Sequence, residues 1–383
     1  MSKASYIEIN QSALIQNINF LKRYFGDNIR ISSVVKANAY GHGIEEIVKI
    51  EEFAGINHFS VFSAIEAKRI CKIKEKDTEV MIMGWMADDE IEWAIEIGVE
   101  FFISDIEVLY KTIEIAGKSK RIANIHLDIE TGMNRTGLEE EELPEVVKLI
   151  KQNKDNINLR GLCTHYAGAE SIANHVRVNK QIRVFNKIKK KLANKGIVPD
   201  MYHTACSAAA MTYPRTRMDM IRVGILQYGY WPSAETFIHF ISRRMEKTDP
   251  LKRIISWKSI VMSLKDVEIG EFISYGTSYL AQEAKKLAIV PIGYSHGYSR
   301  SLSNQGHVLI GGQRAAVIGT VNMNMFIADI TNISDVNIGD EVVLIGEQGE
   351  MEITLSSFAD FNNQLNYELL ARLPQNTEKR IVN

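Results

Sequence analysis

The sequence predicts a (β/α)8 TIM barrel followed by an all-β C-terminal domain. From about residue 30 to residue 224, short apolar runs alternate with amphipathic stretches, the pattern of βα units around a parallel sheet. After about residue 250, short apolar runs are separated by Gly pairs and Asn/Asp clusters, which is typical of an all-β unit. We place the barrel domain at residues 1–245, whose first ~10 residues are free to pack with the β domain, and the β domain at residues 246–383.

Eight apolar runs of strand length occupy the barrel region. They lie at residues 30–36, 58–62, 79–84, 100–104, 122–129, 158–165, 201–205 and 218–224. Helical patterns, apolar at three- and four-residue spacing, lie between them at residues 44–54, 88–97, 106–115 and 140–151. A doubly wound open sheet is the structural alternative. Its usual order places a Gly-rich phosphate loop after the first strand, and residues 34–43, VVKANAYGHG, lack that spacing.

Six further apolar runs predict the β domain. They lie at residues 254–263, 286–292, 307–310, 315–318, 326–330 and 340–345. The charged, proline-containing segment 243–252 is the expected linker, since residues before proline leave the helical region and charges keep a segment in water.

Composition excludes several classes of protein. The 383 residues carry 45 basic and 47 acidic side chains, and no basic block interleaved with aromatics indicates a nucleic-acid surface. The N-terminus lacks an apolar signal region and no stretch is long and apolar enough to span a bilayer, so we expect a cytoplasmic protein without membrane partners. Three cysteines without metal-ligand spacing predict neither a metal site nor a disulfide framework.

The active site of a TIM barrel lies at the carboxyl ends of its strands, so residues at strand exits are the functional candidates. Lys36 follows the first run, and Tyr40 comes soon after it. A lysine that loses water there has a lowered pKa and attacks carbonyls to form a Schiff base. The alternative is a strand-end lysine whose ammonium reaches solvent.

The other strand exits carry further candidates. They are Arg135 after the fifth run, His165 ending the sixth, Ser207 after the seventh, and Arg222, Gly224 and Ile225 at and after the eighth. One lysine, two arginines, a histidine and a loop of small residues form a cradle for an anionic aldehyde, a description that fits pyridoxal 5'-phosphate. The N–H groups of Gly224 and Ile225, with the hydroxyls of Ser207 and Tyr40, would hold its phosphate. Taken singly, Ser207 is equally a helix N-cap and His165 equally a core histidine.

Several motifs together resemble the alanine racemase family over nearly the whole chain. They are VVKANAYGHG (34–43), TGMNRTG (131–137), THYAGAE (164–170), CSAAA (206–210), IRVGILQYG (221–229), ISYGTSY (273–279), IGYSHGY (292–298) and NYE (366–368). The resemblance implies a pyridoxal phosphate enzyme with a barrel and a β domain.

The resemblance also implies the residue roles. Lys36 would be the Schiff-base lysine and one of two acid/base groups, and Tyr275 the other. Tyr275 would reach the site from the partner subunit of a head-to-tail homodimer and form a network with His165 and Arg222. Arg222 would face the pyridine nitrogen, where an arginine cannot donate its proton and so limits electron withdrawal.

The remaining roles concern the substrate and the phosphate. Arg135 would bind the cofactor's phenolic oxygen or the substrate carboxylate, and Tyr367 would contact the phosphate. Tyr294 and Met323 match entrance residues that narrow the mouth and favour a small side chain such as methyl. Without the resemblance, both would be read as β-domain core.

The chain departs from the family at a few positions. Many relatives carry a carbamylated lysine where this sequence has Asp128, which supplies negative charge near Arg135 without modification. Because the aspartate stem is shorter, we expect Asp128 either not to touch Arg135 or to reach it through a bridging water. Asn322 and Asn324 replace the usual cysteine and aspartate beside Met323, which leaves substrate preference open.

The leading hypothesis is therefore an isomerase that interconverts L- and D-alanine and supplies D-alanine for peptidoglycan. A racemase acting on serine or larger side chains is the alternative within enzymes. A pyridoxal phosphate carrier without turnover is the alternative from another class. The β domain with its ISYG motif argues against the carrier, since carriers resemble the barrel alone.

Overall fold

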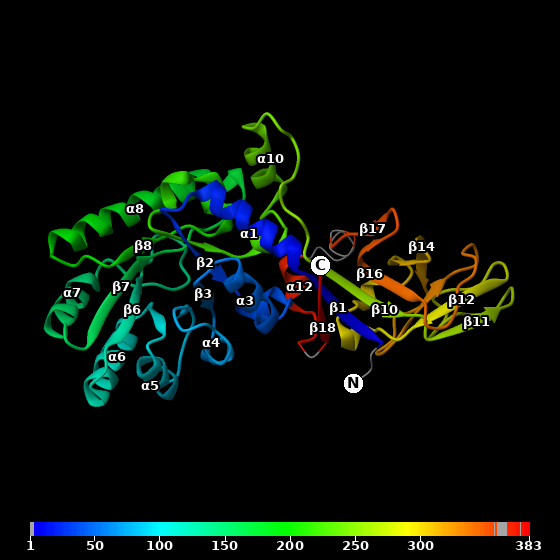
Figure 1. Cartoon of the computed structure of the whole chain (residues 1–383), viewed down its shortest axis with the longest axis horizontal. Coiled ribbons are helices and arrows are strands. Elements are labelled where there is room, and N and C mark those ends of the chain that lie inside the picture. Colours follow the sequence, from blue (N-terminus) through cyan, green and yellow to red (C-terminus); the bar gives the residue numbers. More distant parts are fainter. Residues whose placement is uncertain (1–3, 356, 358–365, 376) are drawn as a thin grey trace. The chain divides into compact units, whose positions relative to one another are not determined.

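The computed structural model describes residues 4–355, 357, 366–375 and 377–383. The chain divides into two compact units (Figure 1). The barrel unit comprises Ser12–Ala39 and Ile47–Arg253, and the β unit comprises Met1–Gln11, Tyr40–Glu46 and Ile254–Asn383. The division after Arg253 lies later than residue 245, so the charged segment expected to be a linker belongs to the barrel unit. The short stretch Tyr40–Glu46 belongs to the β unit, which the sequence did not indicate.

Eight parallel strands form the barrel, in the order β8-β7-β6-β5-β4-β3-β2-β9. They are β2 (Arg30–Val34), β3 (His58–Val61), β4 (Glu79–Ile82), β5 (Glu100–Ile103), β6 (Ala123–Asp128), β7 (Ile157–Cys163), β8 (Met201–His203) and β9 (Met220–Val223). Every predicted run contains one of these strands or, for β7, overlaps it, because a strand buried on both faces is largely a continuous apolar run. The sheet nearly closes between β8 and β9, where Asp219 N–H donates to Tyr202 O (3.1 Å) and Arg222 N–H donates to Ala205 O (2.9 Å). This confirms the predicted barrel and contradicts the open sheet.

Helices cover the outside of the barrel strands, with α5 to α8 beside β6–β8 in Figure 1. The helices of eight or more residues are α1 (Gln11–Phe25), α3 (Ile44–Phe53), α4 (Ala64–Cys71), α5 (Asp88–Ile97), α6 (Ile106–Ser119), α7 (Leu143–Gln152), α8 (His175–Asn194) and α10 (Ala234–Ser242). Helix α7 shows the common pattern: Leu143, Val146, Leu149 and Ile150 are buried at three- and four-residue spacing, while its charged residues face water. None of the described helices is long and apolar enough to cross a membrane.

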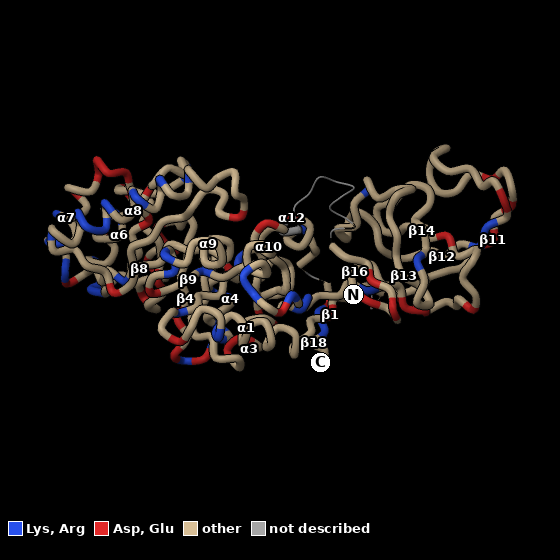
Figure 2. Tube along the Cα trace, turned by 90° about the horizontal axis from the view of Figure 1, so that it is seen from above, with Lys and Arg blue, Asp and Glu red and all other residues tan. Residues whose placement is uncertain are grey.

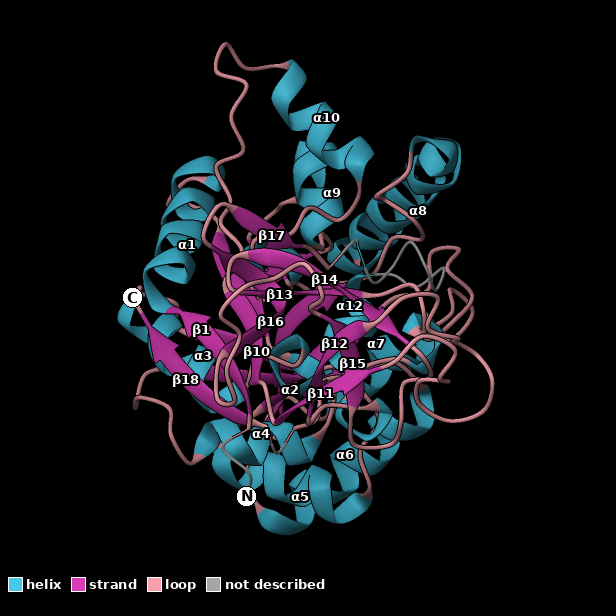
Figure 3. Ribbon diagram, turned by 90° about the vertical axis from the view of Figure 1, so that its right-hand side faces the viewer, coloured by secondary structure: helices cyan, strands magenta, loops and turns pink. Residues whose placement is uncertain are grey.

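The β unit is one largely antiparallel sheet, in the order β11-β12-β15-β14-β13-β16-β10-β1-β18, with β17 paired to β16 (Figure 3). The strands are β1 (Ser5–Asn10), β10 (Ile255–Ile260), β11 (Ser263–Val267), β12 (Lys285–Val290), β13 (His307–Ile310), β14 (Gln313–Ile318), β15 (Phe326–Asp329), β16 (Glu341–Gln348), β17 (Met351–Ile353) and β18 (Glu378–Val382). Strand β1 pairs with β10 on one side and β18 on the other, so both ends of the chain lie in this sheet. Acidic and basic residues are interspersed over both units (Figure 2).

A left-handed turn follows β2. Residues 37–40 all have φ between 51° and 54°, and Gly41 continues the turn at φ 82°. Non-glycine residues in this region cost roughly 1–2 kcal/mol each. A Cβ at Gly41 would overlap the carbonyl oxygen of Leu370 in helix α12 (Asn366–Ala371). Gly41 is therefore required both by its φ and by a close backbone approach.

We predict that Gly41→Ala destabilises the protein more than Gly26→Ala. Gly26 has nearly the same φ, 85°, but nothing lies within 4 Å of an added Cβ, so its substitution carries only the conformational cost of about 1 kcal/mol. Overlap at Leu370 should add about 1–3 kcal/mol at Gly41. Urea denaturation followed by circular dichroism measures both, and equal losses would contradict this interpretation of the turn.

Candidate active site

Lys36 lies where β2 enters the left-handed turn. The preceding residue is fixed by a hydrogen bond from Val35 N–H to Ser60 O on β3 (2.9 Å). The Val34 carbonyl accepts from the Tyr228 hydroxyl (3.1 Å) and from Gln227 Nε2 (3.3 Å). The end of β2 is thus tied to a neighbouring strand and to the short helix η3 (Ile225–Tyr228), and Lys36 projects from a fixed backbone.

Glu66 holds the turn after Lys36. Its carboxylate accepts from Asn38 N–H (3.0 Å) and Phe62 N–H (3.1 Å), joining the loops after β2 and β3. Arg69, one turn along α4, donates to Asn38 Oδ1 (2.7 Å). Sequence reasoning missed both residues, since EAKR in a helix reads as a solvated face.

Arg222 on β9 is the buried cation of the site, with only 5% of its surface exposed. It donates through Nη1 to His203 O (2.7 Å) and through Nη2 to Thr164 O (2.7 Å). Nη1 also donates to His203 Nδ1. The guanidinium lies over the Phe102 ring, with 5.9 Å between Cζ and the ring centroid. Arg222 is thereby fixed by strands β7, β8 and β9.

Burial and positive charge lower the pKa values of the basic side chains at the carboxyl ends of the barrel strands. Burial lowers the pKa of Lys36, and the charges of Arg135 and Arg222 lower it further. Burial, with Arg222, Arg135 and Lys36, also lowers the pKa of His165 to about 3. His165 is therefore a neutral imidazole at physiological pH. The lowered pKa of Lys36 favours its nucleophilic amine form more than that of a solvated lysine.

Glu130 shapes the loop that carries Arg135. Its carboxylate accepts the N–H groups of Met133 (2.7 Å), Asn134 (2.9 Å) and Arg135 (3.4 Å), and also that of Gly132. The side chain of Arg135 is exposed, so its backbone is fixed while its guanidinium remains accessible. Glu130 thus has a structural role that the motif did not reveal.

Buried Gln181 on α8 joins two mouth loops. Its Nε2 donates to His165 O (3.2 Å) and to Thr131 Oγ1 (3.3 Å), and its Oε1 accepts from Ala167 N–H (2.9 Å). The loops after β6 and β7, which carry Arg135 and His165, are therefore set by one amide.

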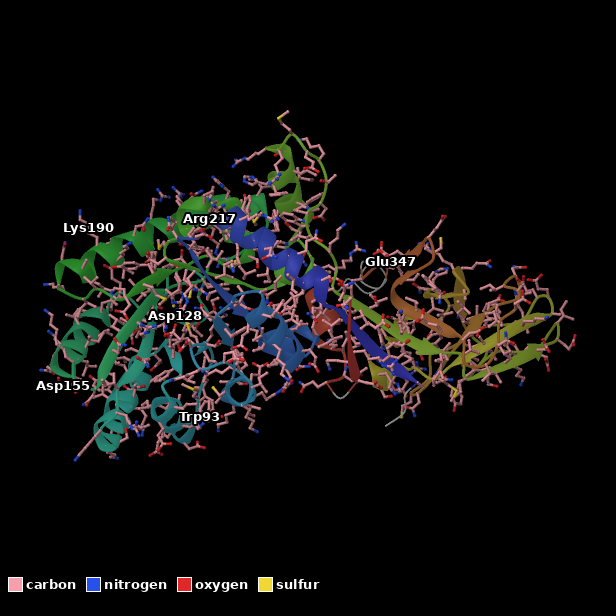
Figure 4. The ribbon with its side chains drawn as sticks, in the orientation of Figure 1. Trp93, Asp128, Asp155, Lys190, Arg217 and Glu347 are labelled. Atoms are coloured by element: carbon pink, nitrogen blue, oxygen red, sulfur yellow. The ribbon has the colours of Figure 1, made fainter. Side chains whose placement is uncertain are left out.

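Asp128 lies at the end of β6 inside the barrel unit (Figure 4). Burial raises its pKa to about 6, although the charges of Arg222 and Arg135 oppose the shift. Among the described residues it accepts hydrogen bonds from Thr136 Oγ1 (3.4 Å) and Cys163 Sγ (3.8 Å), and it forms no ion pair with Arg135. Asp128 consequently acts on the site through its charge at a distance.

The small-residue loop at the eighth strand brings Ser207 and Gly224 together. Ser207, the first residue of α9 (Ser207–Thr212), accepts through Oγ from Gly224 N–H (2.9 Å). Ile225 follows in η3. The Gly224 N–H therefore orients the Ser207 hydroxyl, whose own proton can be donated to an anion beside the start of η3.

The β unit contributes its own cluster of candidates. Tyr275, Tyr294 and Met323 line a hollow of about 410 Å³, together with Arg300 and residues 320–325. They are 74%, 44% and 55% exposed, so Tyr294 and Met323 do not belong to the β-domain core. The hydroxyl of Ser295 fixes the rim by donating to Met323 O (2.7 Å) and contacting Asn324 Oδ1 (2.8 Å).

Two predicted phosphate contacts lie in the same unit. Tyr40 is half-buried at the end of the left-handed turn. Tyr367 belongs to α12, but its side chain lies outside the part of the chain that the structure describes.

Comparison with known proteins places the whole chain in one group. The family model "Alanine racemase, N-terminal domain" matches residues 9–232, and "Alanine racemase, C-terminal domain" matches residues 254–381. The alanine racemase of Halothermothrix orenii is 32% identical over 385 residues, covering 100% of this chain and 98% of that protein. The alanine racemase of Methanococcus maripaludis is 32% identical over 380 residues, covering 98% and 99%.

Solved structures of alanine racemases have the same fold as this chain. The alanine racemase of Clostridium difficile 630 superposes with a TM-score of 0.90 at 30% identity, covering 100% of this chain and 96% of that one. The fold is also that of the alanine racemase from Bartonella henselae with covalently bound pyridoxal phosphate (TM-score 0.84, 23% identity, 100% of each chain).

The neutral state of His165 predicts a pH dependence of stability. Its folded pKa of about 3 lies below the ordinary value of 6.5, so below pH 6.5 the unfolded chain binds one proton more than the folded chain. Stability then falls as pH falls, by about 1.4 kcal/mol per pH unit from this residue. In urea denaturation from pH 7.5 to 4.5, the free energy of unfolding should fall more for the wild type than for His165→Gln. A difference between the two proteins that stays constant with pH would contradict a half-buried, neutral His165.

Proposed function

Because the chain belongs to the alanine racemase family, we propose that it interconverts L- and D-alanine with pyridoxal 5'-phosphate as cofactor. The observation that carries the proposal is the position of Lys36 at the carboxyl end of β2, on a backbone held by hydrogen bonds to β3 and η3. Burial, with Arg135 and Arg222, also lowers the pKa of this lysine, which favours covalent capture of an aldehyde. We further propose that the product D-alanine supplies peptidoglycan synthesis.

The residues of the barrel unit fit that cofactor. Lys36 would bind its aldehyde carbon. The Ser207 hydroxyl and the Ile225 N–H would hold the phosphate, with the Gly224 N–H orienting that hydroxyl. Tyr40 and Tyr367, which belong to the β unit, would join them. Arg222 would face the ring nitrogen. The buried guanidinium donates hydrogen bonds only, so it suits an unprotonated ring nitrogen that accepts one.

The chemistry then depends on proton transfer by this chain's side chains. When bound, pyridoxal phosphate acidifies the Cα proton of an amino acid joined to it. Lys36, released from its bond to the cofactor, would remove or return that proton on one face. Arg222 keeps its proton and so gives none to the ring nitrogen, which favours return of the proton to Cα. Arg135 would bind the substrate carboxylate or the cofactor's phenolic oxygen.

Tyr275 would serve the other face of Cα, from the partner subunit of a head-to-tail homodimer. Its exposure of 74% supports this role, because a base needed by a neighbouring molecule must be accessible. Tyr294 and Met323, in the same hollow, would narrow the entrance and favour a small side chain.

Deuterium exchange at Cα tests the activity. In D₂O the holoenzyme should incorporate deuterium into alanine while circular dichroism shows inversion of either enantiomer. Lys36→Ala should abolish the exchange and the absorbance of the lysine-bound cofactor. Lys49→Ala, which changes an exposed lysine on α3, should retain both. Exchange with serine or larger amino acids but not with alanine would overturn the proposed substrate.

Subunit mixing tests the role of Tyr275. Tyr275→Phe should keep the cofactor absorbance and lose on the order of 10²- to 10⁴-fold in exchange from L-alanine, the usual contribution of a general base. Tyr110→Phe, which changes an exposed tyrosine on α6, is the control and should keep both the absorbance and the exchange. Mixed with Lys36→Ala subunits, Tyr275→Phe subunits should regain activity, since one site of each heterodimer then has both residues. Mixtures that stay inactive while heterodimers form would show that the two residues do not act across an interface.

A further inference from the structure

A chain of polar side chains crosses the interior of the barrel, where apolar layers are usual. Its members come from five strands and are all buried: Ser32 on β2, His58 on β3, Glu100 on β5, His126 on β6 and His203 on β8. This series of hydrogen-bonded side chains ends at Arg222 on β9. None of these residues except Arg222 has a role in the proposed function.

From Arg222 to Glu100, each side chain of this series donates its hydrogen bond to the next one. Arg222 Nη1 donates to His203 Nδ1, so that nitrogen carries no proton and the neutral His203 ring is protonated at Nε2. His203 Nε2 then donates to His126 Nδ1 (2.8 Å). His126 must therefore also be neutral and protonated at Nε2, which donates to Glu100 Oε2 (2.8 Å). Any other protonation of either ring sets two donors or two acceptors against each other.

Glu100 is the anion that terminates the chain. Burial alone would raise its pKa, but hydrogen bonds from His126 and His58 hold it well below its usual range. Its other oxygen accepts from Arg160 Nε (2.7 Å). Arg160 also binds Glu79 (2.7 Å) and Asp200 (2.9 Å) at the surface. The carboxylate is thus satisfied by three donors, as a buried charge requires.

The backbone makes room for the histidine pair. A Cβ on Gly161 of β7 would overlap His126 Nδ1 and would lie 2.8 Å from His203 Nε2. Phe102 covers the same pair, with its ring centroid 6.1 Å from that of His126 and 6.0 Å from that of His203. Gly161 and Phe102 therefore pack against the two histidine rings on either side of the hydrogen bond that joins them.

Resting on the proposed function, we propose that Glu100, His126 and His203 are positioning residues of the active site, which hold the Arg222 cation beside Lys36 and His165. Their hydrogen bonds to Arg222 pass through two neutral imidazoles to a carboxylate in the barrel interior. Three of the five N–H groups of Arg222 donate to the His203 imidazole, the His203 carbonyl and the Thr164 carbonyl. The remaining N–H groups can donate to the ring nitrogen of the cofactor. Both ends specify the same tautomers, because Arg222 can only donate and the Glu100 carboxylate can only accept.

NMR of the ¹⁵N-histidine-labelled holoenzyme tests the chain directly. The wild type should show His126 and His203 as neutral rings protonated at Nε2, with assignments from His126→Gln and His203→Gln. A cationic ring, or a proton on Nδ1, in either residue would overturn the proposal. This measurement does not require turnover. It therefore tests the protonation of His126 and His203 even if the protein does not racemise alanine and the proposed function is wrong.

Glu100→Gln tests the functional consequence. Its NMR spectrum should show the His126 and His203 signals displaced from their wild-type positions, because the acceptor of the His126 proton loses its charge, and kcat for alanine should fall on the order of tenfold at unchanged KM, as when an outer partner of a site ligand is lost. Glu79→Gln is the control, because it removes a neighbouring partner of Arg160 that touches neither histidine. Histidine signals and kcat in Glu100→Gln that match those of Glu79→Gln would overturn the proposal. If Glu100→Gln does not fold, Gly161→Ala, which intrudes on the histidine pair, replaces it with the same expected and contrary results.

Discussion

The burial of one guanidinium constrains the rest of the barrel unit. A cation in a low-dielectric interior is destabilising unless acceptors surround it. Arg222 finds two carbonyls and an imidazole within its own sheet, and the imidazole leads through a second ring to Glu100. The polar residues of β5, β6 and β8, and the glycine at position 161, are consequences of that requirement. The nearly closed barrel makes the arrangement available, since only closure brings β9 beside β8.

The charge of Arg222 also affects the basic side chains at the carboxyl ends of the barrel strands. Burial, with the charges of Arg222 and Arg135, disfavours protonation of Lys36 and His165, and the same two charges oppose the rise that burial causes in the pKa of Asp128. Fixed backbone supports the charges: Glu66 holds the turn after Lys36, Glu130 forms the loop of Arg135, and Gln181 joins that loop to the one carrying His165. A lysine whose pKa is lowered by burial and by neighbouring cations is suited to bind an aldehyde and later to move a proton.

The sequence predicted the eight barrel strands because strands buried on both faces are continuous apolar runs. Strands β1 and β18 were missed because each alternates with charged residues and pairs with a segment distant in sequence. Site residues at strand exits could be predicted from barrel geometry. Glu66, Glu130 and Gln181 could not, because their partners are backbone groups of folded loops. His126 and His203 were unremarkable within their runs, and only the closed sheet brings them together beside Gly161.

Capture of the cofactor by the apoenzyme measures the central claim most directly. Borohydride reduction at a series of pH values, followed by peptide mass spectrometry, identifies the modified lysine and the pH dependence of its reaction with pyridoxal phosphate. We predict that the pyridoxyl group is found on Lys36 and that the rate is half-maximal below pH 10.5, the ordinary lysine value. Modification of a different lysine, or a rate at Lys36 that follows the ordinary value, would contradict a lysine activated by burial and by Arg135 and Arg222.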